Sequence, residues 1–550
     1  MELNTFINDF GLMAEAPNGV QKLREMVFQL AFQGKLVPQN SKSEPASVLL
    51  KKIMADMELI IKKRKVKKGK TLQPITENEK PYKLPNSWEW VRLGNIIKVK
   101  SGDGLTKQKM EKGIIPVYGG NGVTGYHNDF NVKKKTVVIG RVGFYCGSVH
   151  LTPEKAWITD NAFETIYSEN NIYQEFLIWL LKATELNRND HATAQPVISG
   201  AKIYPLLVQL PPFEEQKRIV EKVYQLMKLC DELEERNQKV NKSRIQLNDS
   251  AIDKLLTASA PNEFNTHWNR ITNNFELLYN NPENVKKLRQ AILQLAVQGK
   301  LVPQNPRNEP ASVLLDEIKF EKDRLIREKK LKKTKSLPPI DFEAMPFKLP
   351  VGWQWTYLGE CLLKITDGTH HSPINTPKGK YKYITAKNIK NDGLDLSNVT
   401  YVTQEVHDEI FARCDPELGD ILYIKDGATT GITTINSLSE QFSMLSSVAL
   451  LKLPKQIFNE YLLYLLRSPY YYDLMRAGMT GVAITRVTLK KLNCSIVPIP
   501  PLEEQNQIVK KLDRLMSLGN ILESKLAVSE RGCDQLLEAS INEFTTTKSK

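Results

Sequence analysis

The chain has 550 residues, which predicts three to four domains at ~150 residues each. Hydrophobic residues make up 41% and charged residues 25%, so the chain can bury real cores, which excludes a globally disordered protein. Lysine and arginine number 76 against 62 acidic residues, a net charge of +14, which suggests a polyanionic partner. The excess is modest for so long a chain, and solubility alone would also explain it.

The six cysteines are scattered and form no C-x-x-C pair. This fits a thiol-reducing compartment and excludes a disulfide framework or a zinc ribbon. The first residues, MELNTFINDF, lack the basic and apolar regions of a signal peptide. Apolar stretches such as 460–466 are far too short to cross a bilayer. We therefore expect a soluble, cytoplasmic protein.

An internal repeat organises the chain. Residues 23–50 return as 288–315, with 20 of 28 positions identical at an offset of 265. The same offset relates YKLPNSWEWVRLG (82–94) to FKLPVGWQWTYLG (347–359). PPFEEQKRIVEKVYQLM (211–227) returns as PPLEEQNQIVKKLDRLM (500–516) at an offset of 289, so the second copy holds 24 extra residues between these marks. A closely repeated frame around two dissimilar inserts predicts one scaffold that carries two different readers; free drift after an old duplication is the alternative.

In chain order, each copy begins with two helices. QLAFQGKLVPQN and QLAVQGKLVPQN read as helix ends, with Gly34 or Gly299 after the last turn and a proline beyond it. Residues 44–70 and 309–335 are then predicted as amphipathic helices with basic ends. The tryptophan pairs that follow, at 88/90 and 353/355, belong to the repeated frame and favour core packing over base stacking.

The inserts, 95–210 and 360–499, read as mixed α/β globules that share one fold. VVIGRVGFYCG (137–147) matches ILYIKDGATTG (421–431), and YQEFLIWLL (173–181) matches FNEYLLYLL (458–466). Short β-rich runs, glycine-rich turns and a helix near the end are expected in both inserts. Most of the added length of the second insert is expected before residue 421.

A long helix is predicted after each insert, over 214–256 and 503–541, because neither range contains a proline. A helix of ~40 residues would run about 60 Å. The apolar positions form a heptad-like seam, so each helix should pack along a partner helix. The first seam comprises Ile219, Val223, Leu226, Cys230, Leu233, Asn237 and Val240, and the second comprises Ile508, Leu512, Leu515, Leu518, Leu522 and Leu526.

These elements predict an α+β fold in which two α/β domains are separated by long antiparallel coiled-coil helices with a pseudo-two-fold internal repeat. The N-terminal helices are expected to pack near the C-terminal helix, as residues 283–335 pack after 214–256. The predicted divisions are an N-terminal helical region that repeats 283–345 (1–80), the first α/β domain (81–212), a central helical spacer (213–345), the second α/β domain (346–500) and a C-terminal long helix (501–550).

Basic runs occur at the same place in both copies, just before each insert. Residues 61–70 carry seven Lys or Arg and no acid, and 324–335 carry seven with one acid. Such runs bind phosphates with strong, salt-sensitive and sequence-independent affinity. A solvated helix end explains each run alone nearly as well, but its duplication beside each insert favours a position near the DNA backbone.

A second repeated pattern follows one apolar strand in each insert. Arg141-Val-Gly143-x-x-x-Gly147 corresponds to Lys425-Asp-Gly427-x-x-x-Gly431. A cation and two glycines at a strand end would let the backbone approach a groove or a phosphate closely. An ordinary β-turn with an exposed cation is the alternative.

Two further motifs are less specific. GGNGVTG (119–125) lacks the G-K-[ST] ending of a phosphate-binding loop, so we interpret 118–127 as a flexible loop from which Tyr118, Asn121 and His127 could reach base edges. DGTHHSP (367–373) offers His370 and His371, but adjacent histidines point in different directions and no further ligand stands at metal-like spacing. We therefore expect DNA contact or a plain loop there and no metal site.

No catalytic motif has a convincing frame. Leu210-Pro-Pro-Phe213 resembles the Asn-Pro-Pro-aromatic motif of adenine methyltransferases, but leucine replaces the essential amide. Glu215-Gln-Lys217 superficially fits a nuclease Glu-x-Lys, but it opens a helix and becomes Glu504-Gln-Asn506 in the second copy. With no Walker motif, triad or believable acid pair, the chain looks like a reader without an active site.

Taken together, the repeated GKLVPQN…EPASVLL, LPxxWxW(x)xLG and Pro-Pro-[Phe/Leu]-Glu-Glu-Gln motifs closely resemble the specificity subunits of type I restriction–modification systems. The resemblance covers nearly the whole chain. Its N-terminal extension, a copy of the central helices, is a variant of that layout.

The resemblance implies that each insert is a target-recognition domain that reads one half of a bipartite, asymmetric site in double-stranded DNA. It implies that the long helices set the spacer and dock two methyltransferase subunits, which bind S-adenosylmethionine and flip and methylate adenine. Restriction subunits that use ATP and Mg would join them, and the chain itself would hold no cofactor. The helix positions expected at the docking surface are Ile219, Val223, Leu226, Leu233, Ile508, Leu512, Leu515 and Leu522.

On the same basis, candidate DNA contacts are the exposed cations and polar side chains of both inserts. They are Lys107, Tyr118, Asn121, His127, Lys133, Lys134, Arg141, His370, His371, Lys387, Lys425, Arg476 and Arg486. Two alternatives stay open: a recognition subunit of a related system whose nuclease and methylase are fused, and a coiled-coil scaffold that binds proteins and not DNA.

Overall fold

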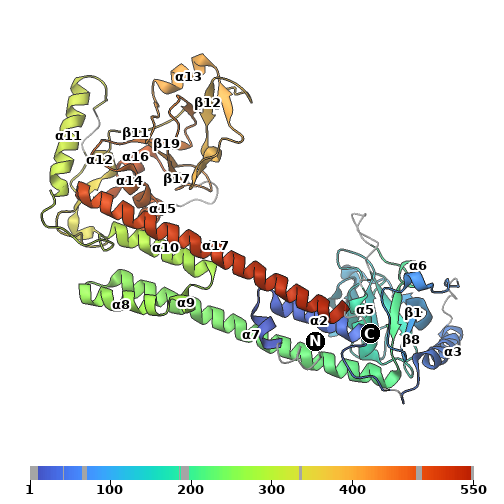
Figure 1. Cartoon of the computed structure of the whole chain (residues 1–550). Coiled ribbons are helices and arrows are strands. Elements are labelled where there is room, and N and C mark those ends of the chain that lie inside the picture. The colour runs from blue at the N-terminus through green and yellow to red at the C-terminus, as the bar shows by residue number, and fades with distance from the viewer. Residues whose placement is uncertain are drawn as a thin grey trace. The chain divides into compact units, whose positions relative to one another are not determined.

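The computed structural model describes residues 10–40, 42–64, 71–184, 186, 197–333, 337–477 and 486–546. The chain divides into two compact units, one formed by Met1–Val240 with Ser529–Lys550 and the other by Asn241–Val528. Each unit has its own sheets and its own hydrophobic core. Two long helices, α7 (Phe213–Thr257) and α17 (Leu502–Thr546), contribute to both units (Figure 1).

The first unit holds an antiparallel four-stranded sheet in the order β2-β8-β5-β6. Its strands are β2 (Ile97–Ser101), β5 (Val137–Gly140), β6 (Val149–Leu151) and β8 (Ala162–Tyr167). A three-stranded sheet, β4-β3-β7, is built from β3 (Ile115–Gly119), β4 (Gly122–His127) and β7 (Trp157–Ile158). The short helices of this domain are α4 (Leu93–Ile96), α5 (Gln174–Ala183) and α6 (Gly200–Ile203).

The second unit repeats this plan with an antiparallel sheet in the order β11-β19-β16-β17. Its strands are β11 (Lys364–Asp367), β16 (Ile421–Ile424), β17 (Thr433–Ile435) and β19 (Val448–Lys452). The second sheet, β15-β12-β18, comprises β12 (Tyr381–Ile384), β15 (Thr400–Val402) and β18 (Ser443–Met444). The short helices are α12 (Leu358–Cys361), α14 (Asn459–Leu466), α15 (Pro469–Arg476) and α16 (Leu489–Asn493).

The two inserts therefore share one fold, as predicted. Within each three-stranded sheet the central strand pairs antiparallel with one neighbour and parallel with the other. The predicted helices near the insert ends are α5 and α14. The added length of the second insert holds α13 (Gln404–Phe411) and the short pair β13 (Ile389–Lys390) and β14 (Gly393–Leu394), all before residue 421.

Each insert is closed at its base by two strands of the repeated frame. β1 (Glu89–Arg92) pairs antiparallel with β9 (Leu207–Leu210), and β10 (Gln354–Tyr357) pairs in the same way with β20 (Ile496–Ile499). The insert thus leaves and re-enters the frame at adjacent points. The frame tryptophans at 88, 90, 353 and 355 are buried, which confirms their predicted packing role.

The remaining helices belong to the helical frame. They are α2 (Gly19–Phe32), α3 (Ala46–Arg64), α8 (Pro261–Asn273), α9 (Phe275–Leu278), α10 (Pro282–Val297) and α11 (Ala311–Arg327). Of these, α8 lies before the repeated part of the second copy. α2 and α10 end as predicted, because Gly34 and Gly299 adopt positive φ angles of 71° and 68°. α11 ends earlier than predicted, because Lys329 adopts φ 60° and the Lys330 N–H returns to the Leu325 carbonyl at 2.9 Å.

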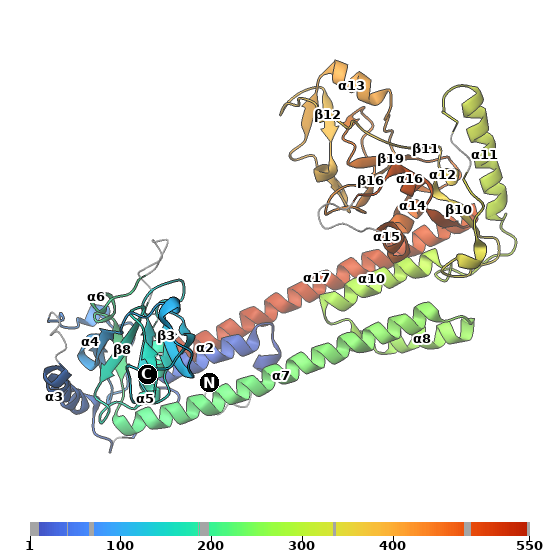
Figure 2. The same ribbon diagram turned by 180° about the vertical axis from the view of Figure 1, so that it is seen from behind.

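The predicted long helices are confirmed, and their seams pack within the chain. Ile219, Val223 and Leu226 belong to the same buried core as α2 and α5. Ile508 and Leu512 belong to the core formed with α10 and α14. In both views α10 lies along α17 (Figure 2). The seam prediction is wrong at Val240 and Leu518, which are exposed.

Charge pairs on α2 and α10 repeat across the two copies. Arg24 reaches Asp231 and Glu234 on α7 at 2.7 and 2.8 Å. At the matching position, Arg289 reaches Glu523 on α17 at 2.9 Å.

The lysines two residues earlier contact the other long helix. Lys22 pairs with Asp534 on α17 at 3.0 Å, and Lys287 pairs with Asp249 on α7 at 2.8 Å. Within each unit, a short frame helix therefore bridges a segment of α7 and a segment of α17. This confirms the expected packing of the N-terminal helices near the C-terminal helix.

The repeated Glu-Glu-Gln motif ties each long helix to its insert. Gln216 accepts a hydrogen bond from the Tyr173 backbone N–H at 2.9 Å and donates to the Pro211 carbonyl at 3.1 Å. Gln505 accepts from the Phe458 backbone N–H at 2.9 Å and donates to the Pro500 carbonyl at 3.3 Å.

The glutamate before this glutamine is buried too. Glu215 accepts hydrogen bonds from the Trp88 indole at 3.0 Å and from the Gln39 amide at 2.6 Å. Burial raises the pKa of the Glu215 carboxyl. Glu215 and Gln216 of the motif that superficially fitted a nuclease are therefore buried packing residues, whereas Lys217 is exposed and pairs with Glu214.

No helix in the described part of the chain is long and apolar enough to span a membrane.

Candidate nucleic-acid interface

The matched strand-end turns are the clearest shared feature of the two sheet-bearing domains. They follow β5 and β16, and their glycines Gly143, Gly147, Gly427 and Gly431 all have φ between 91° and 102°. Side chains other than glycine rarely adopt this conformation, so the glycine spacing fixes the path of the turn. The predicted strand-turn pattern is confirmed in both domains.

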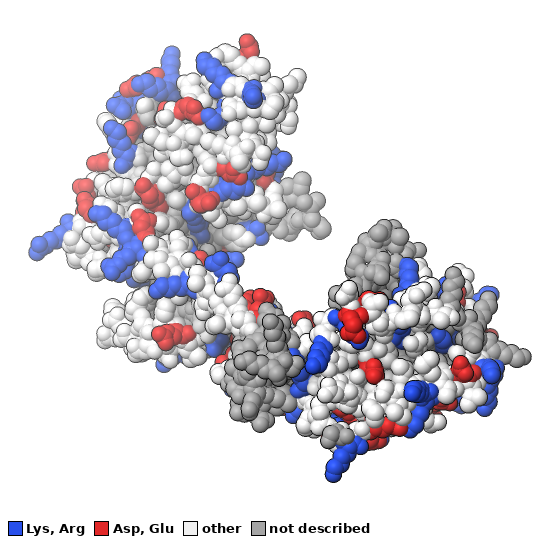
Figure 3. Space-filling model, turned by 45° about the vertical axis from the view of Figure 1, so that its right-hand side comes forward, with Lys and Arg blue, Asp and Glu red and all other residues white. Residues whose placement is uncertain are grey.

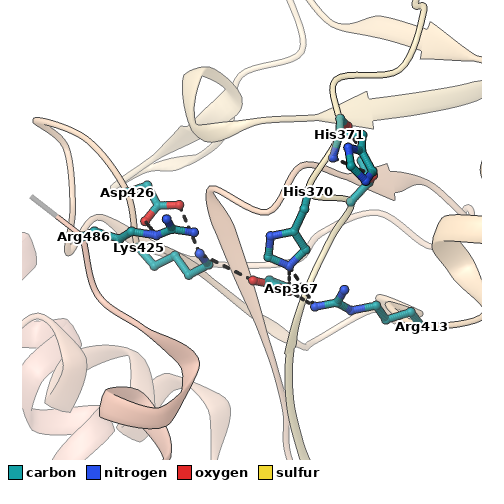
Figure 4. Close-up of polar contacts among 8 residues, drawn as sticks. Asp367, His370, His371, Arg413, Lys425, Asp426 and Arg486 are labelled. Carbon is teal, nitrogen blue, oxygen red and sulfur yellow. Dashed lines mark hydrogen bonds and ion pairs between the residues drawn. The ribbon is translucent and has the colours of Figure 1, made fainter. Parts of the chain in front are cut away.

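In the second domain, the cation of this turn is buried. Only 2% of the Lys425 side chain is exposed, and its ammonium lies 3.0 Å from Asp426 Oδ2 and 3.5 Å from Asp367 Oδ2 (Figure 4). Asp367, at the end of β11, is equally buried. A buried charge is tolerated only when it is paired, so the three groups form one ionic centre. The expectation that Lys425 contacts DNA directly does not fit this conformation.

Three exposed side chains surround this ionic centre. Arg413 Nη2 donates to Asp367 Oδ1 at 2.5 Å, and His370 Nε2 lies 3.0 Å from the same Arg413 nitrogen. On the other side, Arg486 Nε lies 3.3 Å from Asp426 Oδ1. The side chains of Arg413, His370 and Arg486 are 50%, 45% and 60% exposed. They present hydrogen-bond donors to solvent from a fixed base.

These residues come from four segments of the chain. They follow β11, α13 and β16 and precede α16. His371 lies apart from the cluster in Figure 4, and its backbone N–H is bonded to Thr369 Oγ1 at 3.2 Å. Among the described residues, no group of three or more His, Cys, Asp or Glu side chains could hold a metal ion.

The first domain builds the same turn with different chemistry. Arg141 Nη1 donates to Ser101 Oγ at 3.3 Å and to the Asp160 carbonyl at 3.2 Å, and its guanidinium lies 5.4 Å from the Phe163 ring centre. Ser101 ends β2, just as Asp367 ends β11. A hydroxyl and a carbonyl therefore hold the cation here, where the second domain uses two carboxylates.

This first turn also carries two exposed aromatic residues. Phe144 is 83% and Tyr145 58% exposed, and their ring centres lie 5.0 Å apart. The corresponding positions in the second turn are Ala428 and Thr429. Phe144 and Tyr145 were not among the predicted contacts, although both lie inside the matched turn.

The predicted flexible loop at 118–127 is wrong, because this segment is the β3–β4 hairpin with Gly120-Asn121 at its turn. Tyr118 is buried, with its hydroxyl 3.4 Å from the Leu151 carbonyl. His127 is buried and accepts the Glu111 backbone N–H at 3.0 Å. Of the three side chains predicted there, Asn121 alone is exposed.

The other predicted contacts are exposed in both domains. Lys107 lies in the short helix Lys107–Lys109, and Lys387 lies in Ala386–Asn388. Lys134 pairs with Glu169, and Lys133 lies 5.9 Å from the Phe130 ring centre. Arg476 stacks over Tyr472 at 4.4 Å.

Arg413 is another residue that was not predicted from the sequence. It follows α13, in the part of the second insert that has no counterpart in the first, so the repeat gave no signal for it. Within the basic runs, Lys62, Lys63 and Arg64 close α3, while residues 65–70 and 334–336 lie outside the described part. On the face drawn in Figure 3, basic side chains are scattered over both units with acidic ones among them.

Comparison with known proteins gives a consistent result. A family model for the "Type I restriction modification DNA specificity domain" matches residues 85–242 and 350–528. The chain is similar to the specificity subunit of the type I restriction enzyme EcoAI from Escherichia coli, 30% identical over 562 residues, which cover 95% of this chain and 94% of that protein. The EcoEI specificity subunit from Escherichia coli is 29% identical over 572 residues, with the same two coverages.

Among solved structures, a chain from a study of complex assembly and conformational transition in the type I R-M system has a similar fold. Its TM-score is 0.50 at 20% identity, over 85% of this chain and 100% of that chain. At this identity the match concerns the fold alone, and it agrees with two sheet-bearing domains on a helical frame.

Proposed function

Because the chain belongs to the family of type I restriction–modification DNA specificity subunits, we propose that its two sheet-bearing domains each read one half of a bipartite, asymmetric site in double-stranded DNA. In this proposal the chain has no catalysis of its own and works in the cytoplasm. Two methyltransferase subunits supply S-adenosylmethionine chemistry, and restriction subunits supply the chemistry that needs ATP and Mg.

The strongest support for two different recognition domains comes from a comparison of their matched positions. The domains match in sheet order and in the glycines of the strand-end turn, yet the matched positions carry different groups. Ser101 and Arg141 in the first domain correspond to Asp367 and Lys425 in the second. Side chains that differ on a shared backbone present different donors and acceptors to base edges, which is what an asymmetric site requires.

The helical frame is proposed to set the unread spacer between the half-sites and to dock the methyltransferase subunits. The seam positions predicted for docking are inside the units: Ile219, Val223, Leu226, Ile508 and Leu512 are buried, and Leu233, Leu515 and Leu522 pack against the cores. Docking is therefore assigned to outward faces of α7 and α17, where side chains such as Leu518 and Ile521 are exposed.

The test is to co-express the chain with its methyltransferase subunits and to map methylated adenines by single-molecule sequencing. The expected result is a bipartite motif with two modified adenines that flank an unread gap. Exchange of residues 95–210 for the same segment of another specificity subunit should change one half of the motif and leave the other intact. A stable complex that methylates without sequence preference, or no complex at all, would contradict the proposal.

A further inference from the structure

The ionic centre of the second domain has a specific consequence for what that domain recognises, if the proposed function holds. We propose that Arg413 and Arg486 read guanine in the half-site bound by the second domain, and that Lys425 is a positioning residue that never touches DNA. Three features support this role: the ionic centre is buried, each guanidinium group contacts one of its carboxylates, and other donors of each arginine are not used by that contact.

The first step is that the carboxylates cannot move independently. Lys425 and Asp367 each expose 2% of their side chains, and Asp426 exposes 21%. Separation of a buried ion from its partners leaves an uncompensated charge, which is strongly unfavourable. Lys425 therefore holds both carboxylates at fixed positions, and the glycines of its turn fix its own backbone.

The second step is that each carboxylate holds one arginine by one edge. Asp367 engages Nη2 of Arg413, which leaves its Nη1 and Nε donors free of this carboxylate. Asp426 Oδ1 forms an ion pair with Nε of Arg486 at 3.3 Å, and this contact does not use the two terminal nitrogens. An arginine held in this way is already partly ordered, so it loses little further side-chain freedom when it binds DNA. This favours recognition of a particular base over nonspecific charge attraction.

The third step concerns the chemistry of the free groups. A guanidinium has donors and no acceptor. In the major groove guanine offers two acceptors, N7 and O6, whereas adenine offers one acceptor beside an amino donor. An arginine fork therefore matches guanine and is mismatched to adenine. Phosphate also accepts hydrogen bonds, but it requires no such bracing, and an exposed lysine such as Lys387 in the same domain would be sufficient to bind it.

The experiment uses the chain assembled with its methyltransferase subunits. Methylation rates are measured on duplexes that carry every single-base substitution in both half-sites, for wild type, R413A, R413K, R486A, R486K, K425M and K387A. Wild type is expected to require at least one guanine in the second half-site. R413A and R486A should each lower discrimination by ~5- to 100-fold at one guanine position. The lysine variants should not restore it, because lysine lacks the planar fork.

K425M tests the positioning role. It should relax the same guanine positions as the arginine variants and leave discrimination in the first half-site unchanged, with thermal unfolding measured alongside. The exposed arginine variants keep the inference testable if K425M folds poorly. K387A, the matched control, should weaken methylation uniformly on all sequences and reduce its salt dependence.

The results that would overturn this inference differ from those that would overturn the proposed function. Wild type without any sequence preference would overturn the proposed function itself. A specific wild type whose second half-site contains no guanine, or whose R413A and R486A variants discriminate as before, would overturn the inference alone. Uniform loss in both arginine variants, with a reduced salt slope, would assign them to phosphates and overturn it as well.

Discussion

Arg289 on α10 forms an ion pair with Glu523 on α17, with Nη1 and Oε2 2.9 Å apart, and so reproduces the pair that Arg24 forms with Glu234 on α7. Both arginines expose 24% of their side chains. The sequence repeat thus extends to individual contacts between helices. Such pairs add little stability each, but they fix which helices lie side by side.

Charge reversal tests this pairing. R289E should destabilise the chain because it would place a second carboxylate opposite Glu523, and the double variant R289E/E523R should recover most of the loss. The coupling energy is expected to be about 0.5–1 kcal/mol, as for partly exposed pairs, and to shrink at high salt. Urea unfolding of the wild type, both single variants and the double variant measures it. A coupling of zero would show that the pair does not contribute.

Gln216 gives a larger expected effect. Gln216→Leu removes a buried acceptor and donor and leaves the Tyr173 N–H and the Pro211 carbonyl unpaired, at a cost of about 1–3 kcal/mol. Gln505→Leu should behave alike in the other unit. The neighbouring Glu214, with 69% of its side chain exposed, provides the control, since Glu214→Gln should stay within about 0.5 kcal/mol. Equal losses of unfolding free energy from substitutions at positions 214 and 216 would contradict the proposed anchoring role of Gln216.

Asp420 should impose a pH dependence on the second unit. Burial raises the pKa of its carboxyl from 3.8 to about 6. A carboxyl whose pKa is higher in the folded state binds its proton more tightly there, so the stability it contributes is lost as pH rises from about 4 to about 6. Asp420→Asn should flatten this decline in unfolding experiments between these pH values.

Asp395 provides a control of opposite sign for this pH experiment. Hydrogen bonds from the Ser397 side chain and backbone lower the pKa of the Asp395 carboxyl. The ionised Asp395 carboxyl therefore stabilises the fold at pH values above its ordinary pKa, and this stability is lost on acidification. Asp395→Asn should lower the free energy of unfolding at neutral pH and leave it unchanged in acid.

The Asp420 prediction is contradicted if the free energy of unfolding declines with pH at the same slope in D420N and in the wild type, which would show that Asp420 titrates normally.

Lys107, exposed in the first domain, is predicted to contact the DNA backbone. K107A should lower affinity about equally for all sequences and reduce the slope of log affinity against log salt by about 1. Binding of the assembled complex to specific and scrambled duplexes at several salt concentrations measures this. A loss restricted to the specific duplex would make Lys107 a base reader.

Much of the fold was predictable because the chain contains two copies of one arrangement, which can be compared with each other. The repeat marked the frame, the matched inserts and both long helices, and helical periodicity placed the seams. The glycines at 119–122 were misread as a flexible loop. A Cβ added at Gly120 would lie 2.1 Å from the Val142 carbonyl oxygen, so this glycine allows the hairpin to pack against the neighbouring turn.

The candidate site was less predictable. A lysine at a strand end usually reaches solvent, and the burial of Lys425 depends on Asp367, 58 positions earlier in the chain. Arg413 has no counterpart in the first insert, so neither repetition nor spacing could identify it. Contacts between segments distant in sequence made the site, and single-sequence patterns do not report them.

The buried glutamines at the start of the long helices have one further implication. Gln216 and Gln505 hold the inserts through the backbone N–H groups of Tyr173 and Phe458, which nearly any residue at those positions would also provide. These two hydrogen bonds therefore make almost no demand on the amino acid at position 173 or 458, whereas the apolar cores that α5 and α14 share with the long helices do require buried side chains from the inserts. New binding preferences can accumulate on the surface of the insert while these backbone hydrogen bonds keep the junction with the helices intact.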